Sequence, residues 1–170
     1  RAWTAGIYDE GRRGWLYPLD LNPAAKKAFR QGQYNKVRVE CIGNTIKTWI
    51  NNVPAAYLVD EADASGFIAL QVHGIGNSRK PGETIHWRNI RIKTTGITPA
   101  AFPAGIYVKN NVPNQLTDYE KANGWKLLFN GSSGEGWRSA KTTSFPEHGW
   151  EIKDGALTVL SSHGNESARG

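Results

Sequence analysis

An alternation of apolar and polar residues, with a period of two, constrains the fold of this chain more than any other feature. Val37, Val39 and Cys41 alternate with charged residues, a pattern that predicts a strand with one buried face. Residues 43–44 are a Gly-Asn pair typical of a turn, and residues 45–51 then alternate in the same way. The two runs therefore predict antiparallel strands joined by a hairpin.

Similar short runs continue along the chain and are separated by glycine-containing turns. Alternating apolar residues predict strands at residues 67–73 and 85–93. Beyond residue 116, shorter runs predict strands at residues 125–129, 150–153 and 156–160, and the Asp-Gly pair before the last run predicts a second hairpin. The pattern indicates an all-β fold.

Only two helical segments are expected, and both are short. Residues 23–30 begin with a proline after Asn22, a residue that favours the N-cap position. Thr117 is followed three residues later by Glu120, the capping-box spacing, which predicts a helix over residues 117–122. Neither helix is long enough to form a layer of the fold.

The composition argues against several classes of protein. The chain has 170 residues and a net charge of +6, but its Lys and Arg residues are dispersed, which argues against nucleic acid as a partner. No apolar run has the length of a membrane-spanning helix, and no signal peptide is recognisable at the start. The single cysteine, Cys41, excludes an intrachain disulfide and a multi-cysteine zinc site.

The chain is expected to divide into two parts. Residues 98–115 contain three prolines and show no sustained periodicity, so they are predicted to be a connection with one strand at residues 106–109. Residues 1–97 and residues 116–170 are then the two parts that this connection joins.

The predicted strands place polar side chains opposite their apolar faces. Gln71 and His73 share one face of the run at residues 67–73, and this face is either solvated surface or a ligand-binding surface. Arg38 and Glu40 likewise point away from the predicted apolar face, either toward a ligand or in a cross-strand ion pair. If the two strands belong to one sheet, these four side chains converge.

Two further groups of residues are candidates for binding. Trp49 shares a face with Lys47, and its indole ring is either a platform for a sugar or a side chain packed beneath a covering loop. Asp9, Glu10 and Arg13 lie in a dense charged turn, which the residues alone predict to be a solvated loop.

Longer motifs carry a resemblance to a known family. The opening of the DUF1080 family, the 3-keto-disaccharide hydrolase domain, resembles residues 124–131 (GWKLLFNG), 136–138 (GWR) and 149–158 (GWEIKDGALT). The closing half of the same family resembles residues 43–51 (GNTIKTWIN), 66–74 (GFIALQVHG) and 87–93 (WRNIRIK). An end thus precedes a beginning, which predicts the junction of two tandem domains; a circularly permuted single domain is the alternative.

The resemblance implies a concanavalin A-like jelly-roll, a sandwich of antiparallel sheets that handles sugar on its concave sheet. The family's middle strands are missing from both parts of this chain, so the jelly-roll is expected to be incomplete. The remainder of the polypeptide is then needed to complete the fold, and the isolated chain is expected to be prone to aggregation. The family also implies a bacterial protein that is periplasmic or extracellular.

The activity that the resemblance implies is cleavage of 3-keto-glycosides by proton abstraction at C2, elimination of the glycosidic oxygen and hydration. His73 or Glu40 would serve as base or acid. Gln71 and Arg38 would donate to the sugar oxygens, and Trp49 would stack on the ring. The other residues expected to border the substrate are Lys47, Asp9, Glu10 and Arg13.

A non-catalytic carbohydrate-binding module of a larger secreted protein is the alternative function. The close carboxylates that glucanases of this architecture carry on one strand have no counterpart in this sequence. In either case the expected ligand is an oligosaccharide or glycoside. No organic cofactor is expected, and a divalent metal held by His73 with Glu40 or Asp9 is compatible with the residues, although the sequence has no HExxH-type spacing.

Overall fold

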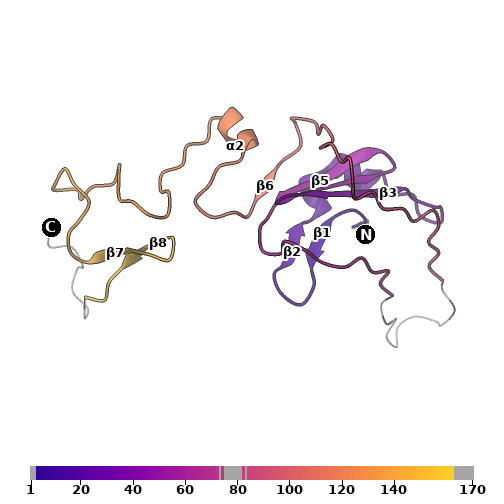
Figure 1. The fold of residues 1–170 in the computed structure, drawn as a ribbon, viewed down its shortest axis with the longest axis horizontal. Coiled ribbons are helices and arrows are strands. Elements are labelled where there is room, and N and C mark those ends of the chain that lie inside the picture. Colours follow the sequence, from indigo (N-terminus) through magenta and orange to yellow (C-terminus); the bar gives the residue numbers. More distant parts are fainter. Residues whose placement is uncertain (1–2, 73, 75–81, 83, 163–170) are drawn as a thin grey trace.

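The largest sheet of the molecule has four strands. We describe the chain from a computed structural model that covers residues 3–72, 74, 82 and 84–162. The strands lie in the order β3 (Val37–Ile42), β4 (Thr45–Ile50), β5 (Val53–Val59) and β6 (Lys109–Asn110) (Figure 1). Neighbours from β3 to β5 are antiparallel, and β6 pairs with β5 in parallel. The predicted β3–β4 pair is confirmed, whereas β5 was not predicted.

Turn residues explain why these strands follow one another so closely. Gly43 connects β3 to β4 with a φ of 57°. Asn51 and Asn52 connect β4 to β5 with φ values of 49° and 68°. Two-residue turns with positive φ at the first central residue, or at both, match the twist of antiparallel strands, and asparagine tolerates this conformation better than most residues.

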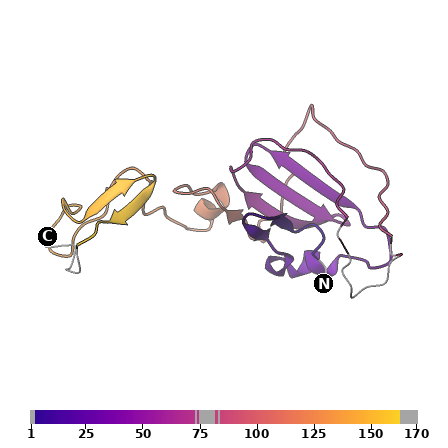
Figure 2. The same ribbon diagram turned by 90° about the horizontal axis from the view of Figure 1, so that it is seen from below.

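A smaller layer packs on one face of this sheet. It contains the antiparallel hairpin of β1 (Ile7–Asp9) and β2 (Gly14–Tyr17), the 3-10 helix η1 (Leu19–Leu21) and helix α1 (Pro23–Lys27) (Figure 2). The buried side chains that join the two layers are Leu19, Ala25, Ile50 and Ala55. Apolar burial between a hairpin, two short helices and a sheet therefore forms the main core.

Asn22 begins α1 as the sequence predicts and also attaches it to the sheet. Its side-chain oxygen accepts a hydrogen bond from the backbone N–H of Ala25. Its amide group donates to the carbonyl oxygens of Pro54 and Ala55, each at 2.9 Å. One buried side chain thus serves as a helix cap and as a link to β5.

The C-terminal part contains helix α2 (Asp118–Ala122) and the hairpin of β7 (Trp150–Lys153) and β8 (Ala156–Val159). The predicted capping box between Thr117 and Glu120 is present. The β7–β8 turn at residues 154–155 has two positive φ values, as its Asp-Gly sequence predicts. Figures 1 and 2 both show this hairpin at the opposite end of the molecule from the main sheet.

Three of the predicted strands are wrong. Residues 67–72 and 85–93 are assigned to no strand, and their apolar side chains are exposed, Phe67 to 91% and Ile92 to 71%. Residues 125–129 also form no strand. A strand needs a hydrogen-bonded neighbour, and no strand of the described residues pairs with these segments.

The predicted buried face of β3 is also wrong. Val39 is 59% exposed, and Val37 and Cys41 are exposed as well. Glu40, on the opposite face, is buried. The alternation was therefore recognised correctly, but the covered face is the polar one.

The predominance of strands in antiparallel and mixed sheets confirms the predicted all-β class and is consistent with a β-sandwich. Residues 98–115, which are predicted to be a connection, contain β6, which begins at Lys109, the last residue of the predicted strand at residues 106–109. Within the described part of the chain, no helix combines the length and the apolar character that crossing a membrane requires.

Candidate functional site

The polar face of the β3–β4 pair brings together four of the residues singled out in the sequence. Arg38 lies opposite Trp49 in the strand register, and Glu40 lies opposite Lys47. Residues directly opposite each other in an antiparallel pair point to the same side of the sheet, and so do residues two positions apart in one strand. These four side chains form one cluster, which we call the polar face.

Glu40 is the centre of the polar face and is held by two cations. Its side chain is 6% exposed, and its Oε2 accepts a hydrogen bond of 2.7 Å from the Arg38 guanidinium. The Nζ of Lys47, itself 9% exposed, lies 3.9 Å from Oε1. A carboxylate withdrawn from water in this way is stabilised by its cationic and hydrogen-bonding partners.

Aromatic rings complete the polar face. The guanidinium carbon of Arg38 lies 4.4 Å from the ring centroid of Trp49, and Nζ of Lys47 lies 4.8 Å from that of Tyr57. Both are cation–π geometries. Burial raises the pKa of Tyr57, and the carboxylates of Asp118 and Glu40 add to this shift. Tyr57 was not predicted because β5 was not recognised, although its apolar run after two asparagines was a usable signal.

A segment distant in sequence lies over the polar face. The backbone N–H of Ala100 donates to both carboxylate oxygens of Glu40, at 3.0 and 3.3 Å, and its carbonyl accepts from Nζ of Lys47 at 2.9 Å. The ring of Phe102 contacts Trp49 and Tyr57 edge-on, with both centroid distances at 5.4 Å. We call residues 100–102 the covering segment. Because of it, Trp49 is only 8% exposed, so the alternative of packing beneath a loop is the one observed.

A small cavity opens beside the covered part of the polar face. It has a volume of about 210 Å³ and is lined by Lys36, Arg38, Trp49 and Asn52. Its polar wall includes the Lys36 ammonium, which donates to the side-chain oxygen of Asn52 at 3.1 Å. An aromatic ring next to amide and cationic donors is a combination suited to a hydroxylated ligand.

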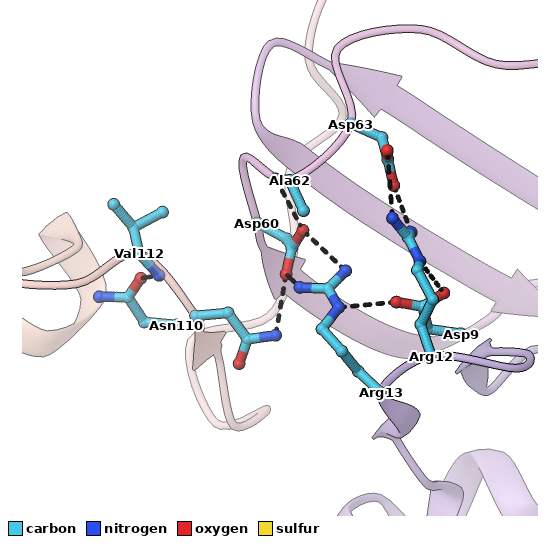
Figure 3. Close-up of polar contacts among 9 residues, drawn as sticks. Asp9, Arg12, Arg13, Asp60, Ala62, Asp63, Asn110 and Val112 are labelled. Atoms are coloured by element: carbon cyan, nitrogen blue, oxygen red, sulfur yellow. Dashed lines mark hydrogen bonds and ion pairs between the residues drawn. The ribbon is translucent and has the colours of Figure 1, made fainter.

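Asp9 and Arg13 belong to a second cluster, which we call the ion-pair network (Figure 3). Arg13 lies between two carboxylates, 2.6 Å from Asp9 and 2.7 Å from Asp60. Arg12 joins Asp9, at 3.0 Å, to Asp63. The network ties the β1–β2 turn to the chain that leaves β5. Asp60 and Asp63 were not among the predicted binding residues.

The carboxylates of the ion-pair network are stabilised in their charged form. Hydrogen bonding from Arg13 lowers the pKa of Asp9, and that from Arg12 lowers the pKa of Asp63. For Asp60, burial raises the pKa, but hydrogen bonds from Arg13 and from the Asn111 side chain outweigh it and the net shift is downward. Because Asp9 and Arg13 are paired with charged side chains of the same chain, their role in this structure is structural.

Gln71 does not join the polar face. Its side-chain amide donates to the Glu10 carboxylate at 2.6 Å, so two predicted substrate-binding residues do meet, but near the β1–β2 turn. The predicted sheet that would bring Gln71 beside Glu40 is absent from the described residues, because residues 67–72 form no strand. His73 lies outside the described residues, and its role stays a prediction.

The two carboxylates considered for a divalent metal lie in different clusters. Glu40 contacts Arg38 and Lys47, whereas Asp9 contacts Arg12 and Arg13. Across the residues that the structure covers, no three His, Cys, Asp or Glu side chains are grouped as metal ligands. Glu40 and Asp9 are thus each arranged for contact with cationic side chains.

Comparison with known proteins agrees with the resemblance seen in the sequence. No curated protein matches the chain. Residues 1–93, more than half of the 170, match a family described as the 3-keto-alpha-glucoside-1,2-lyase-like domain. The match includes the polar face, whereas the resemblance of residues 116–165 stays a prediction. Such a family supports a carbohydrate-active function in general, with sugars as the class of ligand, and the chain belongs to this 3-keto-alpha-glucoside-1,2-lyase-like family.

Proposed function

We propose that this chain is part of an enzyme that cleaves 3-keto-glycosides by elimination followed by hydration. The observation that carries the proposal is the polar face: a buried carboxylate, Glu40, lies between the cations of Arg38 and Lys47 beside the Trp49 ring. The family to which the chain belongs supports the same substrate class.

The reaction requires a base, a cationic group and an acid. The C3 ketone makes the hydrogen on C2 acidic, so a base removes that proton and the electron pair moves onto the C3 oxygen. The enolate then re-forms the ketone and a C1–C2 double bond as the glycosidic oxygen leaves C1 with a proton from an acid. Addition of water across the double bond, with its oxygen on C1, gives the free keto-sugar. Cations near the enolate oxygen stabilise the charge that develops in the first step.

The polar face contains one residue suited to proton transfer and two cations. We assign Glu40 to proton transfer, and Lys47 with Arg38 to stabilisation of the enolate oxygen. Trp49 would stack on the sugar ring, next to the cavity that it lines. His73 is the second candidate for proton transfer, on sequence grounds alone. Gln71, hydrogen-bonded to Glu10, is proposed to contact the more distant part of the substrate.

Sugar release from a 3-keto-glucoside, followed in D₂O, tests the proposal. The elimination mechanism predicts that wild-type protein releases sugar and places deuterium on C2. Glu40→Gln and His73→Ala variants separate the two candidates for proton transfer, and loss of the true base or acid should lower turnover about 10²–10⁴-fold. Glu61→Gln, which changes an exposed carboxylate outside the polar face, is the matched control. Full turnover in both variants would remove these residues from the mechanism.

A carbohydrate-binding module without catalysis is the second candidate. The observation that favours it is that Glu40 is already engaged by its own chain: it accepts hydrogen bonds from Arg38 and from the Ala100 N–H, and the Lys47 ammonium lies 3.9 Å away. Calorimetric titration with the same keto-glucoside distinguishes the two functions. Heat of binding without release of sugar indicates a module, whereas sugar release indicates an enzyme.

A further inference from the structure

We infer that the covering segment, residues 100–102, is an internal competitor that occupies the polar face in place of a sugar and must leave before a sugar binds. This inference concerns access to the site of the proposed function and rests on that function. It follows from three contacts that one short segment makes with the very side chains assigned to the substrate.

The first two contacts come from the two backbone polar groups of one residue, its N–H and its C=O. The N–H of Ala100 donates to Glu40, and the C=O of the same residue accepts from Lys47. The polar face therefore binds a donor and an acceptor that are close neighbours in one molecule. An α-hydroxy ketone, the group formed by C3 of a 3-keto-sugar and its neighbouring hydroxyl carbons, presents the same adjacent donor and acceptor.

The third contact is aromatic. Phe102 packs edge-on against Trp49 and Tyr57, and it covers the ring that the proposed function assigns to sugar stacking. Aromatic pairs of this kind stabilise an ordered segment without adding a polar group. The covering segment thus satisfies both the polar and the apolar requirements of the face, as a ligand would.

The covering segment is also built to detach locally. Residues 84–99, which precede it, are exposed and form no helix or strand, and Ala101 is exposed within it. On its other side the chain is held again at Tyr107, whose carbonyl accepts a hydrogen bond from Tyr17, and it joins the sheet at β6. Segments with few buried contacts open without unfolding of the whole domain. When only a minor fraction of the protein is in the open form, its apparent affinity for a ligand is lowered by that fraction. A variant in which the covering segment is held less tightly should therefore bind the ligand more tightly.

Two variants loosen the cover in different ways. Phe102→Ala removes the ring from Trp49 and Tyr57. Ala100→Pro removes the N–H that donates to Glu40 and leaves Phe102 in place. Phe67→Ala is the matched control, because Phe67 is 91% exposed and lies outside the covering segment. None of these substitutions changes a residue of the polar face.

The binding probe is 3-keto-anhydroglucitol, which keeps the α-hydroxy ketone but has no glycosidic leaving group, and anhydroglucitol is its unoxidised control. We expect the Phe102→Ala and Ala100→Pro variants to bind the keto probe about tenfold more tightly than wild type or Phe67→Ala, with a smaller gain for the control sugar. Hydrogen exchange at the Ala100 amide should be about tenfold faster in Phe102→Ala than in wild type, and the keto probe should accelerate it in wild type.

Each outcome decides one of the two proposals. Equal or weaker binding in both variants, with wild type binding the probe, would overturn the internal competitor. Unchanged exchange at the Ala100 amide in Phe102→Ala would overturn it as well, without any sugar. If exchange accelerates but no protein binds the keto probe, the proposed function is wrong and the detachable cover is supported.

Discussion

Glu40 and Lys47 occupy directly opposed positions of β3 and β4, with Oε1 of the carboxylate 3.9 Å from Nζ of the ammonium. Both side chains are at most 9% exposed, so the pair is largely removed from water. Ala100 completes it by donating its N–H to the carboxylate and accepting from the ammonium. The strand register thus places two opposite charges where the backbone of Ala100 hydrogen-bonds to both of them.

Removing both members of this pair should destabilise the protein by less than the sum of the two single removals. Glu40→Ala leaves the Lys47 ammonium buried beside fewer partners, and we expect a loss of about 3 kcal/mol in the free energy of unfolding. In the double variant Glu40→Ala with Lys47→Ala, the loss should be smaller than the sum of the two single losses. Urea unfolding of the four proteins measures this coupling, and strict additivity would contradict it.

The ion-pair network should make stability sensitive to acid. The pKa values of Asp9, Asp60 and Asp63 are lowered in the folded protein, so these groups stabilise it above the unfolded pKa of about 3.9 and lose that contribution as the pH falls through their folded values. Asp60→Asn should therefore be less stable than wild type at neutral pH, with a difference that shrinks below about pH 4.

Thermal midpoints measured from neutral to acid pH test this expectation. Asp118→Asn removes one negative charge at a fully exposed side chain and controls for net charge. If the difference in thermal midpoint between Asp60→Asn and wild type stayed constant down to the lowest pH, the pairing of Asp60 with Arg13 would not contribute to stability.

Tyr17 should make stability sensitive to alkali. Its side chain is fully buried, its hydroxyl donates to the carbonyl of Tyr107 at 2.8 Å, and burial raises its pKa to about 12. The folded state therefore holds this proton more tightly than the unfolded state, whose tyrosine pKa is about 10. Stability due to Tyr17 is complete below about pH 10 and is lost as the pH rises toward 12.

The Tyr17→Phe variant removes both the hydrogen bond and the titration. We expect it to lose about 1 kcal/mol at neutral pH, because the Tyr107 carbonyl loses a partner. We also expect its stability to fall less steeply than that of wild type above about pH 10. Tyr8→Phe, at a side chain that is 51% exposed, is the comparison. If the stabilities of wild type and Tyr17→Phe fell equally steeply with rising pH, the buried hydroxyl would not be the cause of the alkaline sensitivity.

Asn22 should contribute to stability through two separable sets of hydrogen bonds. Asn22→Ala removes the cap of α1 and leaves the carbonyls of Pro54 and Ala55 without their donor, with an expected loss of about 2–3 kcal/mol. Asn22→Asp keeps the cap acceptor but removes both donors. Chemical denaturation should rank wild type, Asn22→Gly and Asn22→Ala in falling stability, and an Asn22→Asp variant as stable as wild type would show that the link to β5 contributes nothing.

Much of the local structure could be predicted from the sequence because its causes act over a few residues. The Asp-Gly turn of β7–β8, the Asn22 cap of α1 and the Thr117 capping box each depend on the φ preference or the side-chain hydrogen bonds of one short segment. The β3–β4 hairpin was predicted for the same reason, and with it the grouping of Arg38 and Glu40 on one face.

The failures have the opposite origin. Residues 67–72 have the alternation of a strand, but among the described residues no neighbouring strand accepts their backbone hydrogen bonds, and Gln71 contacts Glu10 instead of Glu40. The distant partners of Arg12 and Arg13 are Asp63 and Asp60, the carboxylates after β5, and no local pattern reveals contacts at that separation along the chain. Phe102 lies between two prolines, which mark an irregular segment in the sequence. These prolines do not indicate which side chains the Phe102 ring contacts.

By itself, the sequence determined the all-β class, the position of the tight turns and the two chemically different faces of β3. Only the tertiary structure decided which of those faces is buried: Val39 is exposed, and Glu40 lies beneath a segment 60 residues away. The physical reason is that alternation separates the two sides of a strand but carries no information about what packs on each. That depends on the covering segment, whose peptide group and aromatic ring match the charges and rings of the polar face.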